Sequence, residues 1–75
     1  MDINQALLKL KQNNTKVYPI IKDFKFYVQV QRPDGSLLTY DKVVAPKDLN
    51  DALVATNIHW AETGITNFLK KQNER

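Results

Sequence analysis

The stretch FKFYVQVQRPDGSLLTYDKVV, residues 24–44, alternates apolar and polar side chains, turns sharply, and then alternates again. Alternation with a period of two is the pattern of a β-strand that has one buried face. The central RPDGS is typical of a type I turn, with Pro33 at its second position and Gly35 in a left-handed bulge. This turn pairs Arg32 with Ser36, so the numbers of paired residues sum to 68.

This register predicts which side chains share a face of the hairpin. On the buried side it pairs Val30 with Leu38, Val28 with Tyr40, Phe26 with Lys42 and Phe24 with Val44. The opposite side then carries Lys25, Tyr27, Gln29, Gln31, Thr39 and Asp41. A register shifted by one residue would divide the apolar side chains between the two faces, so the first register is favoured.

The segment before the hairpin predicts a helix and then an extended strand. Apolar residues recur in residues 2–12 at the spacing of one helical face, and Asp2 with Gln5 can form a capping box. The following TKVYPIIKD favours a strand, but Pro19 cannot donate a ladder hydrogen bond. We therefore expect an edge strand here, with a tight turn or bulge at Lys22 and Asp23.

The segment after the hairpin, residues 46–64, predicts a second helix. Pro46 or Lys47 begins it, and Gly64 is a predicted stop before a short helix in residues 65–75. An alternative interpretation ends the helix near Asn57 and makes residues 57–62 a further strand.

Together these segments predict an α+β fold with the order α-β-β-β-α. A two- or three-stranded antiparallel sheet lies between an N-terminal and a C-terminal helix. The 75 residues form a single domain, because so short a chain cannot build a second core.

Composition limits the cellular compartment and the kind of partner that we expect for this protein. Residues 1–32 hold six lysines or arginines against two aspartates, which favours an anionic partner. Cysteine is absent, and no apolar run approaches the length that spans a membrane. We therefore expect a cytoplasmic protein without membrane contact. Self-association would supply extra burial to so small a chain.

The sequence argues against an enzyme. His59 is the only histidine, Ser36 the only serine, and no motif for a metal, a cofactor or a phosphate-cradling loop is present. We predict no catalytic residue, no metal ligand and no cofactor. Trp60 is expected to be a core or interface anchor, and Lys70 and Lys71 either a solvated helix end or, with Trp60, part of a partner interface.

The solvent-facing side of the hairpin is the candidate binding surface. An aromatic ring beside basic and amide side chains suits single-stranded nucleic acid or an acidic protein surface. Tyr27 is expected to be the only aromatic residue on this face. The predicted contact residues are Lys25, Tyr27, Gln29, Gln31, Arg32 and Thr39.

Four short segments carry a resemblance to known families. MDINQALLKLKQ (1–12), KVY (16–18), PDGSLLTY (33–40) and DALVAT (51–56) are similar to the small Thoeris anti-defence 2-like phage proteins. Residues 1–12 and the hairpin that has Asp34 and Gly35 at its turn also resemble compact anti-CRISPR proteins. The resemblance implies a phage or mobile-element inhibitor that binds a host protein or a signalling nucleotide in the host cytoplasm. The alternative is nucleic-acid binding through the sheet face and the basic N-terminal half.

Overall fold

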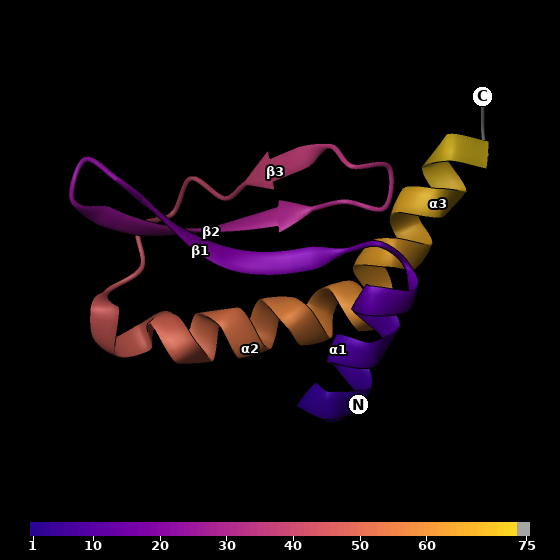
Figure 1. Cartoon of the computed structure of the whole chain (residues 1–75), viewed down its shortest axis with the longest axis horizontal. Coiled ribbons are helices and arrows are strands. Elements are labelled where there is room, and N and C mark those ends of the chain that lie inside the picture. Colours follow the sequence, from indigo (N-terminus) through magenta and orange to yellow (C-terminus); the bar gives the residue numbers. More distant parts are fainter. Residues whose placement is uncertain (74–75) are drawn as a thin grey trace.

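The computed structural model describes residues 1–73 and has the predicted α+β fold (Figure 1). An N-terminal helix, a three-stranded antiparallel sheet and a C-terminal helical segment follow in the predicted order. Residues 74–75, the end of the predicted last helix, lie outside the described part. The elements are α1 (Ile3–Gln12), β1 (Lys16–Lys22), β2 (Lys25–Gln31), β3 (Leu37–Thr39), η1 (Pro46–Asp48), α2 (Leu49–His59), η2 (Trp60–Gly64) and α3 (Ile65–Asn73).

Helix α1 begins and ends with local side-chain signals. The Asp2 carboxylate accepts a hydrogen bond from the Gln5 backbone N–H at 2.8 Å, and the Gln5 side chain accepts one from the Asp2 N–H at 3.3 Å. This confirms the capping box. After the helix, Asn14 adopts a left-handed conformation with φ of 54°, which asparagine tolerates. Ala6 and Leu10 are the buried residues of the helix.

The turn between β2 and β3 fixes the predicted register over β3. The Arg32 N–H donates to the Ser36 carbonyl at 2.8 Å, and Val30 lies opposite Leu38. The Tyr40 N–H still donates to the Val28 carbonyl at 3.0 Å, and beyond Tyr40 the chain leaves the sheet and returns for one isolated pair, Phe26 with Val44. The predicted pairings of Phe24 with Val44 and of Phe26 with Lys42 are therefore wrong, because the chain between Tyr40 and Val44 shifts the register by two residues.

The turn between β1 and β2 takes Phe24 out of the strand. Lys22 pairs with Lys25, and the two residues between them have positive φ angles, 52° at Asp23 and 64° at Phe24. This is the geometry of a type I′ hairpin turn. Phe24 is fully exposed, so the prediction that it faces the helices is also wrong.

Strand β1 is an edge strand, as predicted, and Pro19 is compatible with it. The N–H groups of Tyr40 and Val44 donate to the carbonyls of Val28 and Phe26, so the even-numbered residues of β2 bond toward β3. The odd-numbered residues of β2 therefore bond toward β1. Pro19 lies opposite Val28 and directs its nitrogen to the free edge, where no ladder hydrogen bond is lost.

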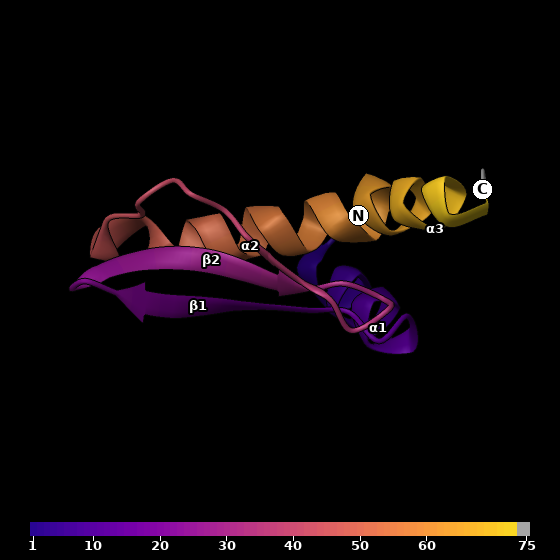
Figure 2. The same cartoon turned by 90° about the horizontal axis from the view of Figure 1, so that it is seen from above.

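The C-terminal segment is helical from η1 through α3; α2 runs along one side of the sheet, and α3 lies beyond the end of the strands (Figures 1 and 2). Residues 57–62 are helical, and the alternative strand is not formed. The prediction that Gly64 stops the helix is wrong, because the chain passes through it in a π-helical turn closed by a hydrogen bond from the Ile65 N–H to the Trp60 carbonyl.

The core lies where α1, η2 and one end of the sheet meet. Trp60 is 6% exposed, and its indole N–H donates to the Tyr40 hydroxyl at 3.0 Å. This hydrogen bond joins the segment after β3 to η2 in the C-terminal helical segment. The buried residues of the core are Ala6, Leu10, Val30, Trp60, Ala61 and Ile65.

Candidate functional site

In the described part of the chain, residues 1–73, one face of the sheet has no helix over it (Figures 1 and 2). Side chains alternate along a strand, so the register determines the residues of this outer face. Its residues all have some exposure to solvent. They are Lys16, Tyr18, Ile20 and Lys22 of β1, Lys25, Tyr27, Gln29 and Gln31 of β2, and Leu37 and Thr39 of β3.

A hydrogen-bonded row crosses all three strands of the outer face. The Thr39 hydroxyl donates to the side-chain oxygen Oε1 of Gln29 at 2.8 Å, and the side-chain amide nitrogen Nε2 of Gln29 donates to the Tyr18 hydroxyl at 2.6 Å. Gln29 is thereby fixed in orientation. The Tyr18 hydroxyl accepts in this row, so its own proton stays available to a ligand.

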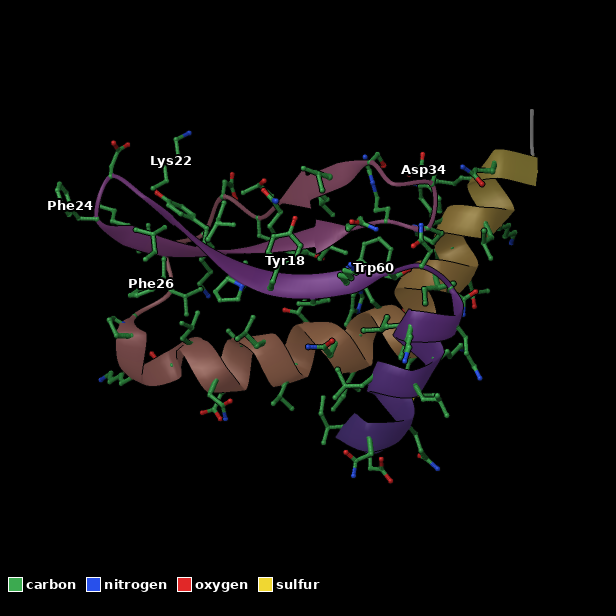
Figure 3. The ribbon with its side chains drawn as sticks, viewed as in Figure 1. Tyr18, Lys22, Phe24, Phe26, Asp34 and Trp60 are labelled. Carbon is green, nitrogen blue, oxygen red and sulfur yellow. The ribbon has the colours of Figure 1, made fainter. Side chains whose placement is uncertain are left out.

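Two tyrosines lie on the outer face. Tyr18 is opposite Gln29 and Tyr27 is opposite Ile20, so the two rings are diagonal neighbours on adjacent strands. The expectation that Tyr27 is the only aromatic residue of this face is therefore wrong. Figure 3 shows the Tyr18 ring projecting from β1 at the sheet.

Three lysines give the outer face a positive charge. Within residues 1–73 the only ion pair joins the Met1 amino group to Glu62, at 3.3 Å, so Lys16, Lys22 and Lys25 have no carboxylate within salt-bridge distance. Lys22 and Lys25 are moreover directly opposite each other, an arrangement of like charges that destabilises a strand pair.

Two carboxylates lie beside one end of this face. Asp23 and Asp41 line an open pocket of about 360 Å³ together with Lys22 and Tyr27. The end with Lys16 has no acidic residue among the lining residues of its adjoining pocket. The positive charge of the face is therefore least opposed toward Lys16.

Two further predicted contact residues, Arg32 and Gln31, also have hydrogen-bond partners within the fold. Arg32 lies toward α3 and not on the outer face, with its guanidinium carbon 5.7 Å from the centre of the Phe68 ring and its Nε–H donating to the Ser36 hydroxyl at 2.7 Å. The Gln31 amide remains on the face and donates to the Asn14 carbonyl at 3.3 Å. The structure thus brings Lys25, Tyr27, Gln29, Gln31 and Thr39 together, and separates Arg32 from them.

The predicted interface residues at the C-terminal end also differ in their exposure to solvent. Trp60 is a core residue with only 6% of its surface exposed, so of the two roles expected for it, core anchor and interface anchor, the structure shows the core role. Lys70 and Lys71 are exposed on α3. They lie on the helical segment and not on the outer face.

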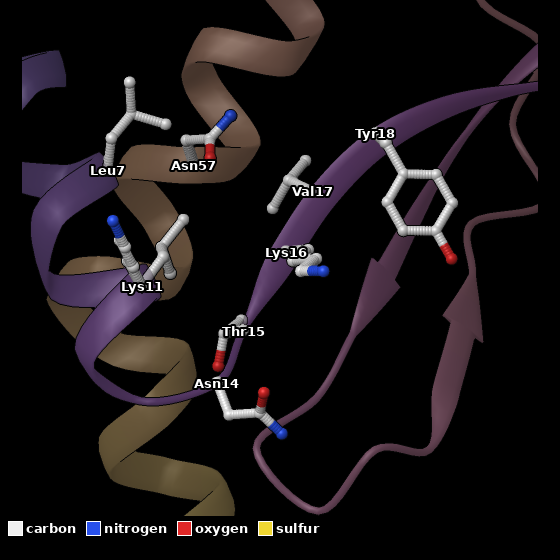
Figure 4. A pocket seen from close by; sticks show the side chains of 9 residues that line it. Leu7, Lys11, Asn14, Thr15, Lys16, Val17, Tyr18 and Asn57 are labelled. Carbon is white, nitrogen blue, oxygen red and sulfur yellow. The ribbon is translucent and has the colours of Figure 1, made fainter.

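A pocket of about 480 Å³ opens between α1 and β1 (Figure 4). Leu7 and Asn57 line it from the helices, and Val17 and Tyr18 from β1. The Asn57 side chain is 7% exposed and donates its amide to the Leu53 carbonyl at 2.7 Å. Because Tyr18 belongs to both, the pocket adjoins the outer face at its core end.

A second groove, of about 490 Å³, lies between the β2–β3 turn and α3. Arg32, His59 and Lys71 contribute basic groups to it, and Phe68 contributes an aromatic ring. His59 is exposed, and its Nδ1 has the Thr63 hydroxyl as its neighbour at 3.3 Å.

Asp34 also lines this second groove, at the β2–β3 turn. The hydrogen bonds from the Ser36 hydroxyl and backbone N–H lower the pKa of Asp34 below its ordinary value of 3.8.

Among residues 1–73, no helix has both the length and the apolar character that a bilayer crossing needs.

No family model, curated protein or solved structure matches this chain. The resemblance to small phage proteins therefore stays a prediction from four short segments. The candidate site consists of the outer face, whose second tyrosine could not be placed by alternation alone, because Pro19 interrupts the strand pattern of β1.

Proposed function

We propose that this protein is a non-catalytic binding module that holds single-stranded nucleic acid on the outer face of its sheet. The observation that carries the proposal is the pair of neighbouring tyrosines among three lysines that have no carboxylate partner within residues 1–73. Aromatic rings that stack on bases, beside cations that contact phosphates, are how proteins bind single strands without strong sequence preference.

The residues of the face divide into two roles under this proposal. Tyr18 and Tyr27 offer their rings to two successive bases, and Lys16, Lys22 and Lys25 contact the phosphates. Lys16 and Lys22 are six residues apart on β1, which corresponds to about 20 Å of strand. A phosphate near Lys22 and Lys25 would also relieve the repulsion between these two facing ammonium groups.

The first test is a titration of fluorescein-labelled oligothymidylate, twelve nucleotides long, followed by fluorescence anisotropy at several salt concentrations. Contacts from three lysines predict a slope of log K against log salt of about −2. Tyr27→Ala should weaken binding by about 1–3 kcal/mol, which is about 5- to 150-fold. Lys25→Glu should weaken it further at low salt.

Lys47→Glu is the matched control, because it makes the same charge change on η1, away from the outer face. If Lys47→Glu weakens binding as much as Lys25→Glu does, the effect comes from net charge and the outer face is not the site. Absence of binding by the unchanged protein at low salt refutes the proposal altogether.

A second candidate function is the binding of a small signalling nucleotide in the groove beside α3. It is favoured by the basic groups of Arg32 and Lys71 around the Phe68 ring, since a nucleotide offers both a phosphate and an aromatic base. This candidate retains the inhibitor function that the sequence resemblance implies.

Calorimetry against cyclic mono- and dinucleotides tests this second candidate. Lys71→Glu should abolish binding, whereas Lys70→Glu should leave it intact, because Lys71 lines the groove and Lys70 does not. Equal effects of the two substitutions, or no heat of binding, would remove it. Light scattering on the same samples reports whether the protein self-associates, and pull-down from host lysate addresses a protein partner.

A further inference from the structure

Phe24 occupies a position in which the fold gains nothing from a phenylalanine. Its side chain is fully exposed, and Figure 3 shows it pointing away from the rest of the molecule, at the far end from Trp60. Its φ of 64° is a left-handed conformation that is unfavourable for a residue with a bulky side chain. A glycine or asparagine would form this type I′ turn without that cost.

The residues on either side of this turn are also in positions that cost the fold free energy. Ile21 is 69% exposed, and Lys22 and Lys25 face each other across the base of the turn. Local strain, an exposed apolar pair and facing like charges thus coincide at one tip. Such costs persist where the surrounding structure or a ligand requires them, so the tip is a candidate contact point.

The tip lies on the path that a strand bound to the outer face would follow. Along the β1–β2 hairpin, Tyr18 comes first, Tyr27 next and the tip last, with Lys22 and Lys25 between Tyr27 and Phe24. Phe24 is three residues beyond Tyr27, which corresponds to about 10 Å of strand. Aromatic rings and cations therefore follow one another along the hairpin to its end.

We infer that Phe24 is a third stacking residue for the same single-stranded nucleic acid. This inference rests on the proposed function of the outer face. The bound strand runs along the hairpin, its phosphates contact Lys22 and Lys25, and the exposed ring of Phe24 stacks on a base at the tip. An anionic membrane would be an alternative partner for the tip. The small apolar area of Phe24 and Ile21 favours the nucleic acid, because one exposed ring is enough to stack on a base, whereas stable membrane binding needs a larger buried apolar area.

Two substitutions test the inference with the twelve-nucleotide oligothymidylate. Phe24→Asn removes the ring and suits the left-handed backbone, and it should weaken binding by about 5- to 150-fold. Phe24→Trp keeps a stacking ring and should retain the affinity of the unchanged protein. The new indole emission should also be quenched as oligonucleotide is added, whereas the buried Trp60 of the unchanged protein should show little quenching.

The inference requires both results. If Phe24→Asn binds normally, or if the Phe24→Trp emission does not respond, Phe24 does not stack on the bound strand. In that case a continued loss of affinity in Tyr27→Ala leaves the proposed function standing.

Failure of the unchanged protein to bind oligonucleotide removes both proposals. Binding to phosphatidylglycerol vesicles that depends on Phe24, without oligonucleotide binding, would assign the tip to a membrane surface instead. Circular dichroism melting curves confirm that each variant is folded.

Discussion

Gly64 lies in η2, within the continuous helical segment formed by α2, η2 and α3. One methyl group added at this residue should have a large effect on stability. A Cβ at this position would lie 2.6 Å from both Cδ2 and Cε3 of the Trp60 indole and 3.0 Å from its Cγ. Ordinary contacts between carbon atoms are about 3.5–4.0 Å, so the indole must move by about 1 Å. Trp60 is buried and hydrogen bonded to Tyr40, so it has little room for this movement.

The expected change in unfolding free energy for Gly64→Ala is a net of opposing terms. Overpacking of a core costs about 1–3 kcal/mol, and weakening of the Trp60–Tyr40 hydrogen bond adds about 0.5–1.5 kcal/mol. The higher helix propensity of alanine returns about 1 kcal/mol. We therefore expect a destabilisation of about 1–3 kcal/mol, in a chain whose total stability should be about 4–11 kcal/mol.

Urea denaturation measures this change, with an expected fall of the midpoint of about 1 M or more. A double-mutant cycle with Trp60→Leu gives the sharper test, because without the indole the added methyl has no ring to displace. In that background Gly64→Ala should stabilise the helix. The same destabilisation in both backgrounds, or a Gly64→Ala protein as stable as the unchanged one, would refute the close packing of Trp60 on Gly64.

Three further predictions concern single side chains. Phe24→Asn should raise the unfolding free energy by about 1 kcal/mol, because it relieves left-handed strain without losing contacts. Thermal melts measure this change. A lower stability of the variant would mean that the Phe24 ring packs on the fold. Tyr40→Phe should lower it by about 1–2 kcal/mol, because the buried Trp60 N–H loses its acceptor; unchanged stability would contradict this role. The lowered pKa of Asp34 contributes stability above pH 3.8, the ordinary value for aspartate, which is lost as the pH falls through the folded-state pKa. The difference in urea midpoint between the unchanged protein and Asp34→Asn should therefore shrink from pH 5 to pH 2, and a constant difference would mean that the Ser36 hydrogen bonds do not hold the charged form.

The order of elements, the capping box and the register of β3 could be predicted because each depends on local chemistry. The Pro33–Gly35 turn determines which residues of the two strands meet, and Val30 and Leu38 follow from it. The pairing of Phe26 with Val44 could not be predicted. A shift of two residues leaves each side chain on the same face, so the alternation of apolar and polar residues contains no trace of it.

The candidate site was predicted in part for a similar reason. Alternation placed Lys25, Tyr27 and Gln29 on one face, but it left out Tyr18, whose strand contains a proline. Phe24 also escaped prediction, since neither it nor Asp23 is the glycine that usually marks a type I′ turn.

The proline on the outer strand has a consequence for the protein at high concentration. A row of unpaired backbone donors at the margin of a sheet is a template on which identical chains add and grow into fibres. In β1 that row lacks its middle donor, because Pro19 faces outward there. Replacing Pro19 with valine would complete the row without removing any bond inside the fold, and concentrated samples would then become prone to polymerise.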